Sequence, residues 1–310
     1  MSFFSTMGLF FKKIFYYIAT ACVTLYFLIG GWHVVFPNQY SDRLDLTGRE
    51  IVWQDEFDGD SIDTSKWEVY DTNGHTTFFT PDQVTVSDGC ARLRIEYHKD
   101  GKFGDGFYGG WLSTANTFRY AYGYYEIRCK MPKGEGLHAA FWTYQDELWH
   151  YDYTADKGTE IDIFENAFYR VNDRPDIINN TYTIALHAGD GKGNHLGVGS
   201  DKICTLEGDG TNMYDSFHTY GLEWTENEYI FYYDGIEVYR VDFSKGSVNG
   251  ISTTCKEPMF LYVSTHVGTQ VRDDGSIRDE WNGNAFNNPE GTFPTDFVVD
   301  YVRVYAPTSK

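Results

Sequence analysis

The chain has 310 residues, of which 45 are acidic and 25 basic, giving a formal net charge of −20. A surface this acidic repels nucleic acid, so we expect no nucleic-acid partner, and it favours a neutral polysaccharide over a highly sulfated one. Aromatic residues make up 18% of the chain. Sheets favour such residues, but the excess also suits a cleft whose flat rings contact the apolar faces of sugars.

The N-terminal region differs in character from the rest. Residues 14–36 carry no formal charge and are long enough to cross a bilayer. Lys12 and Lys13 precede them, so the positive-inside rule places residues 1–13 in the cytoplasm. We predict an uncleaved transmembrane signal anchor at 14–36, a polar spacer at 37–49 and a folded domain at 50–310 on the extracytoplasmic side of the membrane. A cleaved signal peptide, which would release the domain, is the alternative.

From residue 50 onward the pattern is that of an all-β domain. Residues 91–97 and 125–131 alternate between apolar and polar side chains. Residues 229–233 and 236–240 flank Asp234-Gly235, a strong signal for a two-residue hairpin turn. No long segment with helical periodicity follows the anchor. These features predict an antiparallel β-sandwich, with two sheets packed face to face.

The most informative run is Glu-Ile-Asp-Ile-Phe-Glu at residues 160–165, which sets three carboxylates among apolar residues. Burying three neighbouring carboxylates is costly, and a fold accepts this most readily where it needs a proton donor beside a nucleophile. Side chains alternate along a strand, so Glu160 and Asp162 share a face whereas Glu165 would lie on the other. A β-bulge between Asp162 and Glu165 would bring all three to one face.

This run resembles the bulged Glu-x-Asp-x-x-Glu signature of glycoside hydrolase family 16. Further segments are similar to the family's in the same order: residues 53–59, 62–67, 122–132, 140–142, 217–224, 233–235 and 299–305. The resemblance implies that residues 50–310 form the catalytic domain, a jelly roll whose concave sheet forms an open substrate cleft.

The resemblance also implies the chemistry of the three acids. Glu160 would be the nucleophile, Glu165 the general acid and later the base, and Asp162 a partner that hydrogen-bonds Glu160 and helps keep Glu165 protonated. No cofactor is needed for this reaction. We expect a retaining endo-acting hydrolase of β-1,3- or mixed β-1,3/1,4-glucan. A β-galactan hydrolase of the agarase or endo-β-galactosidase type, a transglycosylase and a non-catalytic glycan-binding sandwich are alternatives.

The sequence signal for substrate-binding residues is less specific than the signal for the three acids. By the resemblance, Trp142 would stack on a sugar, and His187 would bond a substrate hydroxyl or assist Glu165. Trp111, Trp149 and Trp281 lie in glycine-rich or polar stretches and are candidates for the cleft wall. For each of the five residues, packing within the protein is the alternative interpretation.

Two features lie outside the acidic run. The resemblance implies a structural calcium ion held by the carboxylates of Glu56 and Asp300 and the carbonyl of Gly89, away from the cleft. The sequence also departs from the family's glucanase pattern, since Leu137-His138-Ala139 stands where Trp-Pro is usual before residues 140–142. This departure affects the choice of glycan and not the chemistry.

The cysteines suggest one disulfide. Cys129 shares its strand face with apolar residues, so we expect a buried free thiol, while Cys90 lies on the face of two arginines. Cys204 and Cys255, in polar surroundings, are the more plausible pair in an exported domain.

Overall fold

The computed structural model divides the chain into two units, Met1–Asp42 and Arg43–Lys310. The structure describes residues 43–74, 76–146, 151–167, 181–204, 213–271, 275–279, 283–289 and 292–307. The predicted anchor at 14–36 lies outside the described residues and stays a prediction. Within the described part, no helix is both long and apolar enough to span a bilayer.

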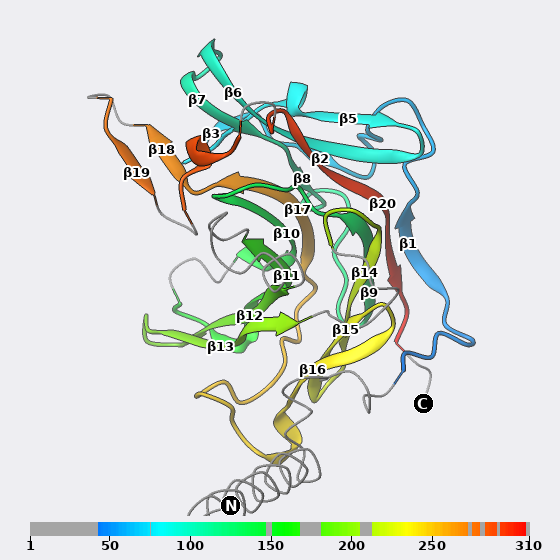
Figure 1. The fold of residues 1–310 in the computed structure, drawn as a ribbon. Helices are drawn as coiled ribbons and strands as arrows, with labels where there is room; N and C mark the ends of the chain where they lie inside the picture. The colour runs from blue at the N-terminus through cyan, green and yellow to red at the C-terminus, as the bar shows by residue number, and fades with distance from the viewer. Residues whose placement is uncertain are drawn as a thin grey trace, which may run out of the picture. The chain divides into compact units, whose positions relative to one another are not determined.

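The described unit consists almost entirely of strands (Figure 1). The first strands are β1 (Ile51–Asp55), β2 (Glu68–Val69), β3 (Thr72–Asn73), β4 (Phe78–Phe79), β5 (Val84–Ser87), β6 (Cys90–Gly101), β7 (Gly104–Gly109), β8 (Trp111–Ser113), β9 (Gly123–Lys130) and β10 (Leu137–Tyr144). They are followed by β11 (Thr154–Ala167), β12 (Thr181–Asp190), β13 (His195–Cys204), β14 (His218–Trp224), β15 (Glu228–Tyr233), β16 (Ile236–Asp242), β17 (Phe260–Val267), β18 (Thr269–Val271), β19 (Ile277–Asp279) and β20 (Thr295–Tyr305). Short 3₁₀ turns lie at Pro81–Gln83, Phe243–Lys245 and Ala285–Asn287.

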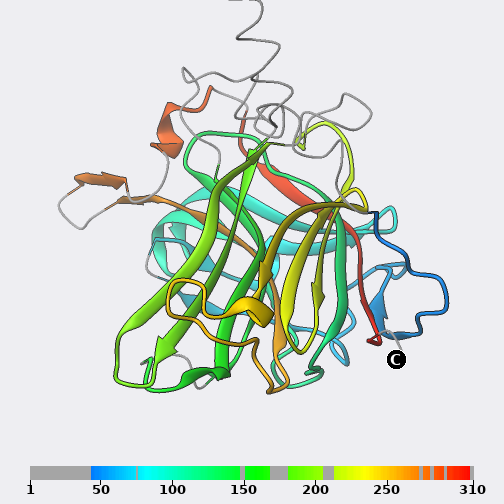
Figure 2. The ribbon, with the colours of Figure 1, turned by 90° about the horizontal axis from the view of Figure 1, so that it is seen from below.

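Two large sheets form the sandwich. One has seven strands in the order β13-β12-β11-β10-β17-β8-β2, and the other has eleven, with β16-β15-β14-β9-β20-β6-β7-β4-β3 as its main path. Seen from below, the green strands β10 to β13 form one wall and the yellow strands β14 to β16 continue the other (Figure 2). The predicted β-sandwich is confirmed, and the Asp234-Gly235 hairpin forms with positive φ at both residues.

The core lies between the sheets and is rich in aromatic rings. Phe164 of the seven-stranded sheet packs against Tyr220 of the other, with ring centroids 4.6 Å apart. Trp67 and Trp224 are each 1% exposed, and Trp53 packs on Trp67 at the margin of the core. Many of the aromatic residues counted in the sequence therefore fill this core instead of a cleft.

The cysteine predictions have a mixed outcome. Cys90, Cys129 and Cys255 are all buried free thiols, so the prediction for Cys129 is confirmed. The expected disulfide between Cys204 and Cys255 is wrong, because the Cys255 thiol is free and directed at the carbonyl oxygen of Glu257, 3.6 Å away. Although the sequence around Cys255 is polar, its side chain is fully buried, and Trp224 Nε1 of β14 donates to its carbonyl at 3.1 Å.

Candidate active site

The acidic run lies in the middle of β11, which pairs with β10 on one side and β12 on the other. Along β10, Phe141 is opposite Phe164 and Trp142 is opposite Asp162, so Ile163 is the extra residue of a β-bulge. Along β12 the register shifts at the same place, between Asp162 and Glu165. The predicted bulge is therefore present.

The bulge directs the apolar side chains of the run into the core and the three acids to the opposite face of the strand. Ile161, Ile163 and Phe164 are at most 1% exposed and belong to the core between the sheets. Two successive apolar residues can both enter the core only because the strand kinks, and Glu165 then returns to the face of the first two acids. The Thr183 hydroxyl donates to the Glu165 carbonyl at 3.2 Å and so holds the backbone beside the bulge.

The three acids are buried to different degrees on the face of the seven-stranded sheet that is turned away from the core. Asp162 is 2% exposed, whereas the Glu165 side chain is 30% exposed. Donor atoms of Glu160, Asp162 and His187 all lie within 4.8 Å of one another. Among the described residues, this is the one group of three such side chains close enough to hold a metal ion.

Histidines from the neighbouring strands contact these acids. His187 of β12 lies opposite Glu160, and its Nε2 is 3.3 Å from Asp162 Oδ2. His187 Nδ1 is 2.8 Å from Nε2 of His195 on β13. On the other side, His138 of β10 places Nε2 3.3 Å from Glu165 Oε1, and its ring lies 6.0 Å from that of His266 on β17. Each end of the acidic trio is therefore backed by two histidines.

These contacts divide the protons unevenly among the carboxyls. Burial, with the charge of Asp162, raises the pKa of Glu160 to about 8. Burial, with the charge of Glu165, raises the pKa of Asp162 well above its usual range. Burial also acts on Glu165, but the hydrogen bond and charge of His138 outweigh it and lower the pKa of that carboxyl. Burial therefore favours a proton on the Glu160–Asp162 pair, whereas the contact with His138 favours an ionised Glu165.

Aromatic rings continue the same face beyond the acids. Trp142 lies directly opposite Asp162 and is half-buried, with Nε1 donating to Ser264 Oγ at 3.1 Å. Its ring lies 4.3 Å from that of Tyr262 and 5.9 Å from that of Trp111. Tyr70 also packs on Trp111, at 4.7 Å. Trp142, Trp111 and His187 are therefore brought to the face of the acids, while Trp149 and Trp281 lie outside the described residues.

Comparison with known proteins identifies the family. Residues 52–307 match the sequence profile described as "Beta-porphyranase A-D, GH16 domain". The chain belongs to glycoside hydrolase family 16. A family 16 chain is a glycoside hydrolase, and the resemblance drawn from the motifs is confirmed.

Named relatives of this family 16 protein are mostly glucanases. A beta-glucanase from Rhodothermus marinus is 30% identical over 282 residues, covering 86% of this chain and 88% of that protein. Glucan endo-1,3-beta-glucosidase A1 from Niallia circulans is 26% identical over 285 residues, covering 84% of this chain but 38% of that protein. The laminarinase catalytic domain from Thermotoga petrophila shares the fold, with a TM-score of 0.66 and 24% identity over 84% of this chain and 99% of that one.

The donor set predicted for calcium does not fit a shared cation. Both Glu56 oxygens accept from Arg303 at 2.7 Å, and Asp300 is bound by Arg128. Gly89 lies in the turn between β5 and β6, with φ +70°. Since each carboxylate is already neutralised by its own arginine, a cation would have to displace two ion pairs. Calcium binding stays a prediction, and no step of the chemistry depends on it.

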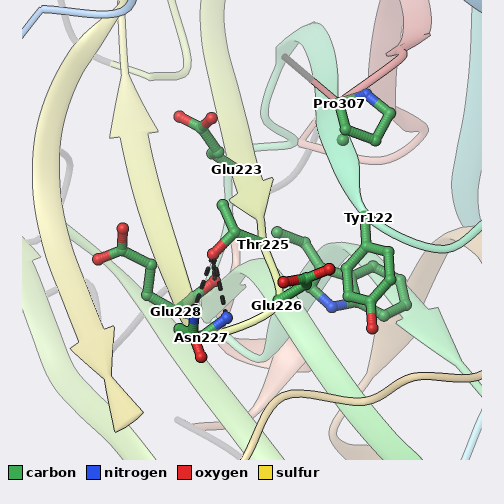
Figure 3. Close-up of a pocket in the computed structure, with 9 residues that line it drawn as sticks. Tyr122, Glu223, Thr225, Glu226, Asn227, Glu228 and Pro307 are labelled. Carbon is green, nitrogen blue, oxygen red and sulfur yellow. Dashed lines mark hydrogen bonds between the residues drawn. The ribbon is translucent and has the colours of Figure 1, made fainter. Parts of the chain in front are cut away.

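A separate pocket of about 480 Å³ lies at the ends of β9 and β14, in the eleven-stranded sheet. Glu223, Glu226 and Glu228 surround it, and Thr225 Oγ1 accepts from the backbone N–H groups of Asn227 and Glu228 (Figure 3). None of its lining residues belongs to β10, β11, β12 or β17. It is therefore distinct from the acidic cleft.

The sequence interpretation named His138 only within a departure that affects the choice of glycan, without its contact to Glu165. It missed Tyr262 and His266, which lie on the face of the acids, and His195, which supports this face from β13. Strand alternation could have identified His138, because residues 138, 140 and 142 lie on the same face of β10. The other three come from strands whose neighbours are not evident from sequence.

Proposed function

We propose that this chain is a retaining endo-β-glucanase acting on β-1,3- or mixed β-1,3/1,4-glucan through a covalent glycosyl-enzyme intermediate. The observation that carries the proposal is the bulge at Ile163, which gathers Glu160, Asp162 and Glu165 on one face beside Trp142. Two glutamates on one face, with an aspartate between them, suit a nucleophile and an acid/base acting on opposite sides of one bond.

In the first step, ionised Glu160 attacks the anomeric carbon while Glu165 gives a proton to the leaving oxygen. Asp162, whose pKa is raised by burial and by the charge of Glu165, retains the proton that it shares with Glu160, so the nucleophile is free to act. In the second step, Glu165 takes a proton from water as the water oxygen displaces Glu160. Trp142 and Trp111 offer flat surfaces for sugar rings beside this position.

The chemistry of the cleft supports a neutral substrate. The described strand positions that share the face of the acids carry no lysine or arginine: 138, 140, 142 and 144 on β10, 183, 185 and 187 on β12, and 262, 264 and 266 on β17. A sulfated chain would be expected to meet such cations. The glucanase relatives support the same choice.

A β-galactan hydrolase is the second candidate, supported by the porphyranase description of the matching profile and by His138 in place of the family's usual tryptophan. A test is incubation of the full chain with laminarin, lichenan, agarose and porphyran, with reducing ends and product anomers followed over time. We expect β-anomers to appear first from laminarin or lichenan. If reducing ends are released only from agarose or porphyran, the substrate is a galactan and not a glucan. First-formed α-anomers would exclude the covalent route.

A Glu160→Gln variant tests the roles of the acids. It should bind laminarin while releasing no reducing ends, because an amide cannot attack the anomeric carbon. The matched control is Glu228→Gln, which changes a glutamate of the other sheet that is paired with Arg240. Wild-type turnover in Glu160→Gln would contradict the proposed nucleophile.

A further inference from the structure

The carboxyls of Glu160 and Asp162 and the imidazole of His187 converge on one point of the cleft. One donor atom from each side chain lies within 4.8 Å of the other two. Glu160 and Asp162 share a face of β11, and His187 lies directly opposite Glu160 on β12. Strand register therefore brings together two carboxylates and one imidazole, which are ligands of the kinds that bind transition metals.

The closest pair of these donors has the spacing of two metal ligands. Nε2 of His187 is 3.3 Å from Oδ2 of Asp162, whose side chain is only 3% exposed. That oxygen accepts no hydrogen bond from the residues that the structure describes. Ligand atoms about 2.0–2.2 Å from a tetrahedral zinc ion are about 3.3–3.5 Å from each other. The ion lies off the line that joins its two ligands, so a linear hydrogen bond between them is not expected.

We propose that Glu160, Asp162 and His187 form a binding site for a divalent transition-metal ion such as zinc, and that the bound ion inhibits the enzyme reversibly. The metal site itself depends on the geometry of the three side chains. The inhibition rests on the proposed function of Glu160 as the nucleophile. A Glu160 oxygen that coordinates zinc cannot attack the anomeric carbon, so the ion and the reacting sugar exclude each other.

A second histidine orients the imidazole for this role. Nε2 of His195 is 2.8 Å from Nδ1 of His187, so Nδ1 is engaged and Nε2 is the nitrogen that faces Asp162. Tyr151 packs on the ring of His195, with centroids 5.0 Å apart. Partners of this kind fix the ring of a metal-binding histidine and contribute to the affinity for the ion.

The charge and the accessibility of the site also suit a cation. The described strand positions on the face of the acids carry no lysine or arginine, so no permanent positive charge from them neutralises the two carboxyls. Burial favours a proton on the Glu160–Asp162 pair, and coordination releases that proton to solvent and replaces it with a larger positive charge. The His187 side chain is 32% exposed, which gives the ion a path from solvent and lets water supply a fourth ligand.

The imidazole nitrogen determines which ions are expected. Calcium and magnesium take oxygen ligands, whereas zinc and copper bind imidazole well. Zinc and copper should therefore bind at these three residues, and calcium and magnesium should not. This selectivity is the opposite of that expected for the oxygen donors of Glu56, Asp300 and Gly89.

Isothermal titration calorimetry with zinc at neutral pH tests the site on the full chain. The wild type should bind one ion in its tightest site. Glu160→Gln and His187→Gln should each weaken that binding by more than tenfold, because each variant loses a ligand. His195→Gln should weaken it by about tenfold, because the ring of His187 loses the partner that orients it.

Two histidine variants serve as matched controls. His138→Gln removes the imidazole at the other end of the acidic trio, 3.3 Å from Glu165. His98→Gln removes a histidine paired with Glu96 at 3.0 Å on the other sheet. Both should bind zinc as tightly as the wild type, which would separate the proposed site from the other histidines.

Initial rates on laminarin, or on whichever glycan the wild type hydrolyses, give a second readout. Zinc should raise the apparent KM with little change in kcat, because ion and substrate compete for Glu160. The inhibition constant should agree with the dissociation constant from calorimetry, and EDTA should restore the rate. Magnesium and calcium at the same concentration should leave the rate unchanged.

The outcomes separate the two proposals. The metal site is refuted if the wild type binds no zinc, or if Glu160→Gln and His187→Gln bind it as tightly as the wild type. If either of these variants unfolds, Asp162→Asn takes its place. Zinc that binds at the three residues and leaves the rate unchanged would overturn the inhibition alone. A wild type that cleaves no glycan refutes the proposed function, while calorimetry still decides whether the metal site exists.

Discussion

Removing single residues from β11 tests whether strand alternation assembles the site. Deleting Ile163 removes the bulge, and Glu160, Asp162 and Glu165 then follow one another at alternate positions of a regular strand. All three acids remain on the same face, with Ile161 and Phe164 still directed into the core. Deleting Ile161 leaves the bulge but puts Glu160 and Asp162 out of phase, so that one of them must face the core.

The expected magnitudes follow from burial. Ile163 is 1% exposed and Ile161 is fully buried, so each deletion should lower the free energy of unfolding by about 2–5 kcal/mol through the loss of one core side chain. Deleting Ile161 should cost several kcal/mol more, because a carboxyl enters an apolar environment. Ile163→Ala keeps the bulge and should lose stability alone.

Urea unfolding and the release of reducing ends measure both effects. Without Ile163, the backbone of Glu165 shifts by up to about 3.3 Å, so kcat should fall by about 100-fold or more yet stay above the Glu160→Gln background. Without Ile161, activity should fall to that background. If the Ile161 deletion proves as stable and active as the Ile163 deletion, strand phase does not place these acids.

Three further predictions concern the neighbouring groups. Because the folded state raises the pKa of Glu160 to about 8, the native protein holds a proton that the unfolded chain releases. The free energy of unfolding should therefore fall by up to about 1.4 kcal/mol per pH unit between about pH 5 and 8. Urea titrations of Glu160→Gln should show a flatter dependence on pH. Trp111→Ala should raise KM for laminarin about tenfold with little change in kcat, since a stacking surface binds ground and transition states alike; a loss confined to kcat would contradict this role. Adding calcium or EDTA should leave the melting temperature unchanged, because Arg303 and Arg128 already neutralise Glu56 and Asp300; a rise with calcium would restore the cation site that the family resemblance implies.

The arrangement within β11 could be predicted because its constraints are local. Apolar and acidic side chains cannot share a face, so the run from Glu160 to Glu165 admits one bulge as the economical solution. Local reasoning failed for Cys255, whose polar neighbours in sequence do not show that its own side chain is buried.

What local reasoning could not supply is the identity of neighbouring strands. The sheet brings β10, β17 and β12 beside or near β11, although 115 residues separate the end of β10 at Tyr144 from the start of β17 at Phe260. His266 and Tyr262 therefore gave no sequence signal of their part in the cleft. The electrostatics of the trio also depend on these strands, so the lowered pKa of Glu165 has no signal in the sequence.

The histidines explain how this sheet tolerates three carboxyls in one run. His187 approaches Asp162 from β12 with His195 behind it, and His138 approaches Glu165 from β10 with His266 near it. An arginine in either place would fix both carboxylates in the ionised form, because a guanidinium does not release its proton. A histidine can contact a carboxylate as closely without that permanent charge, so the two histidine pairs accommodate the acids without fixing all three in the ionised form.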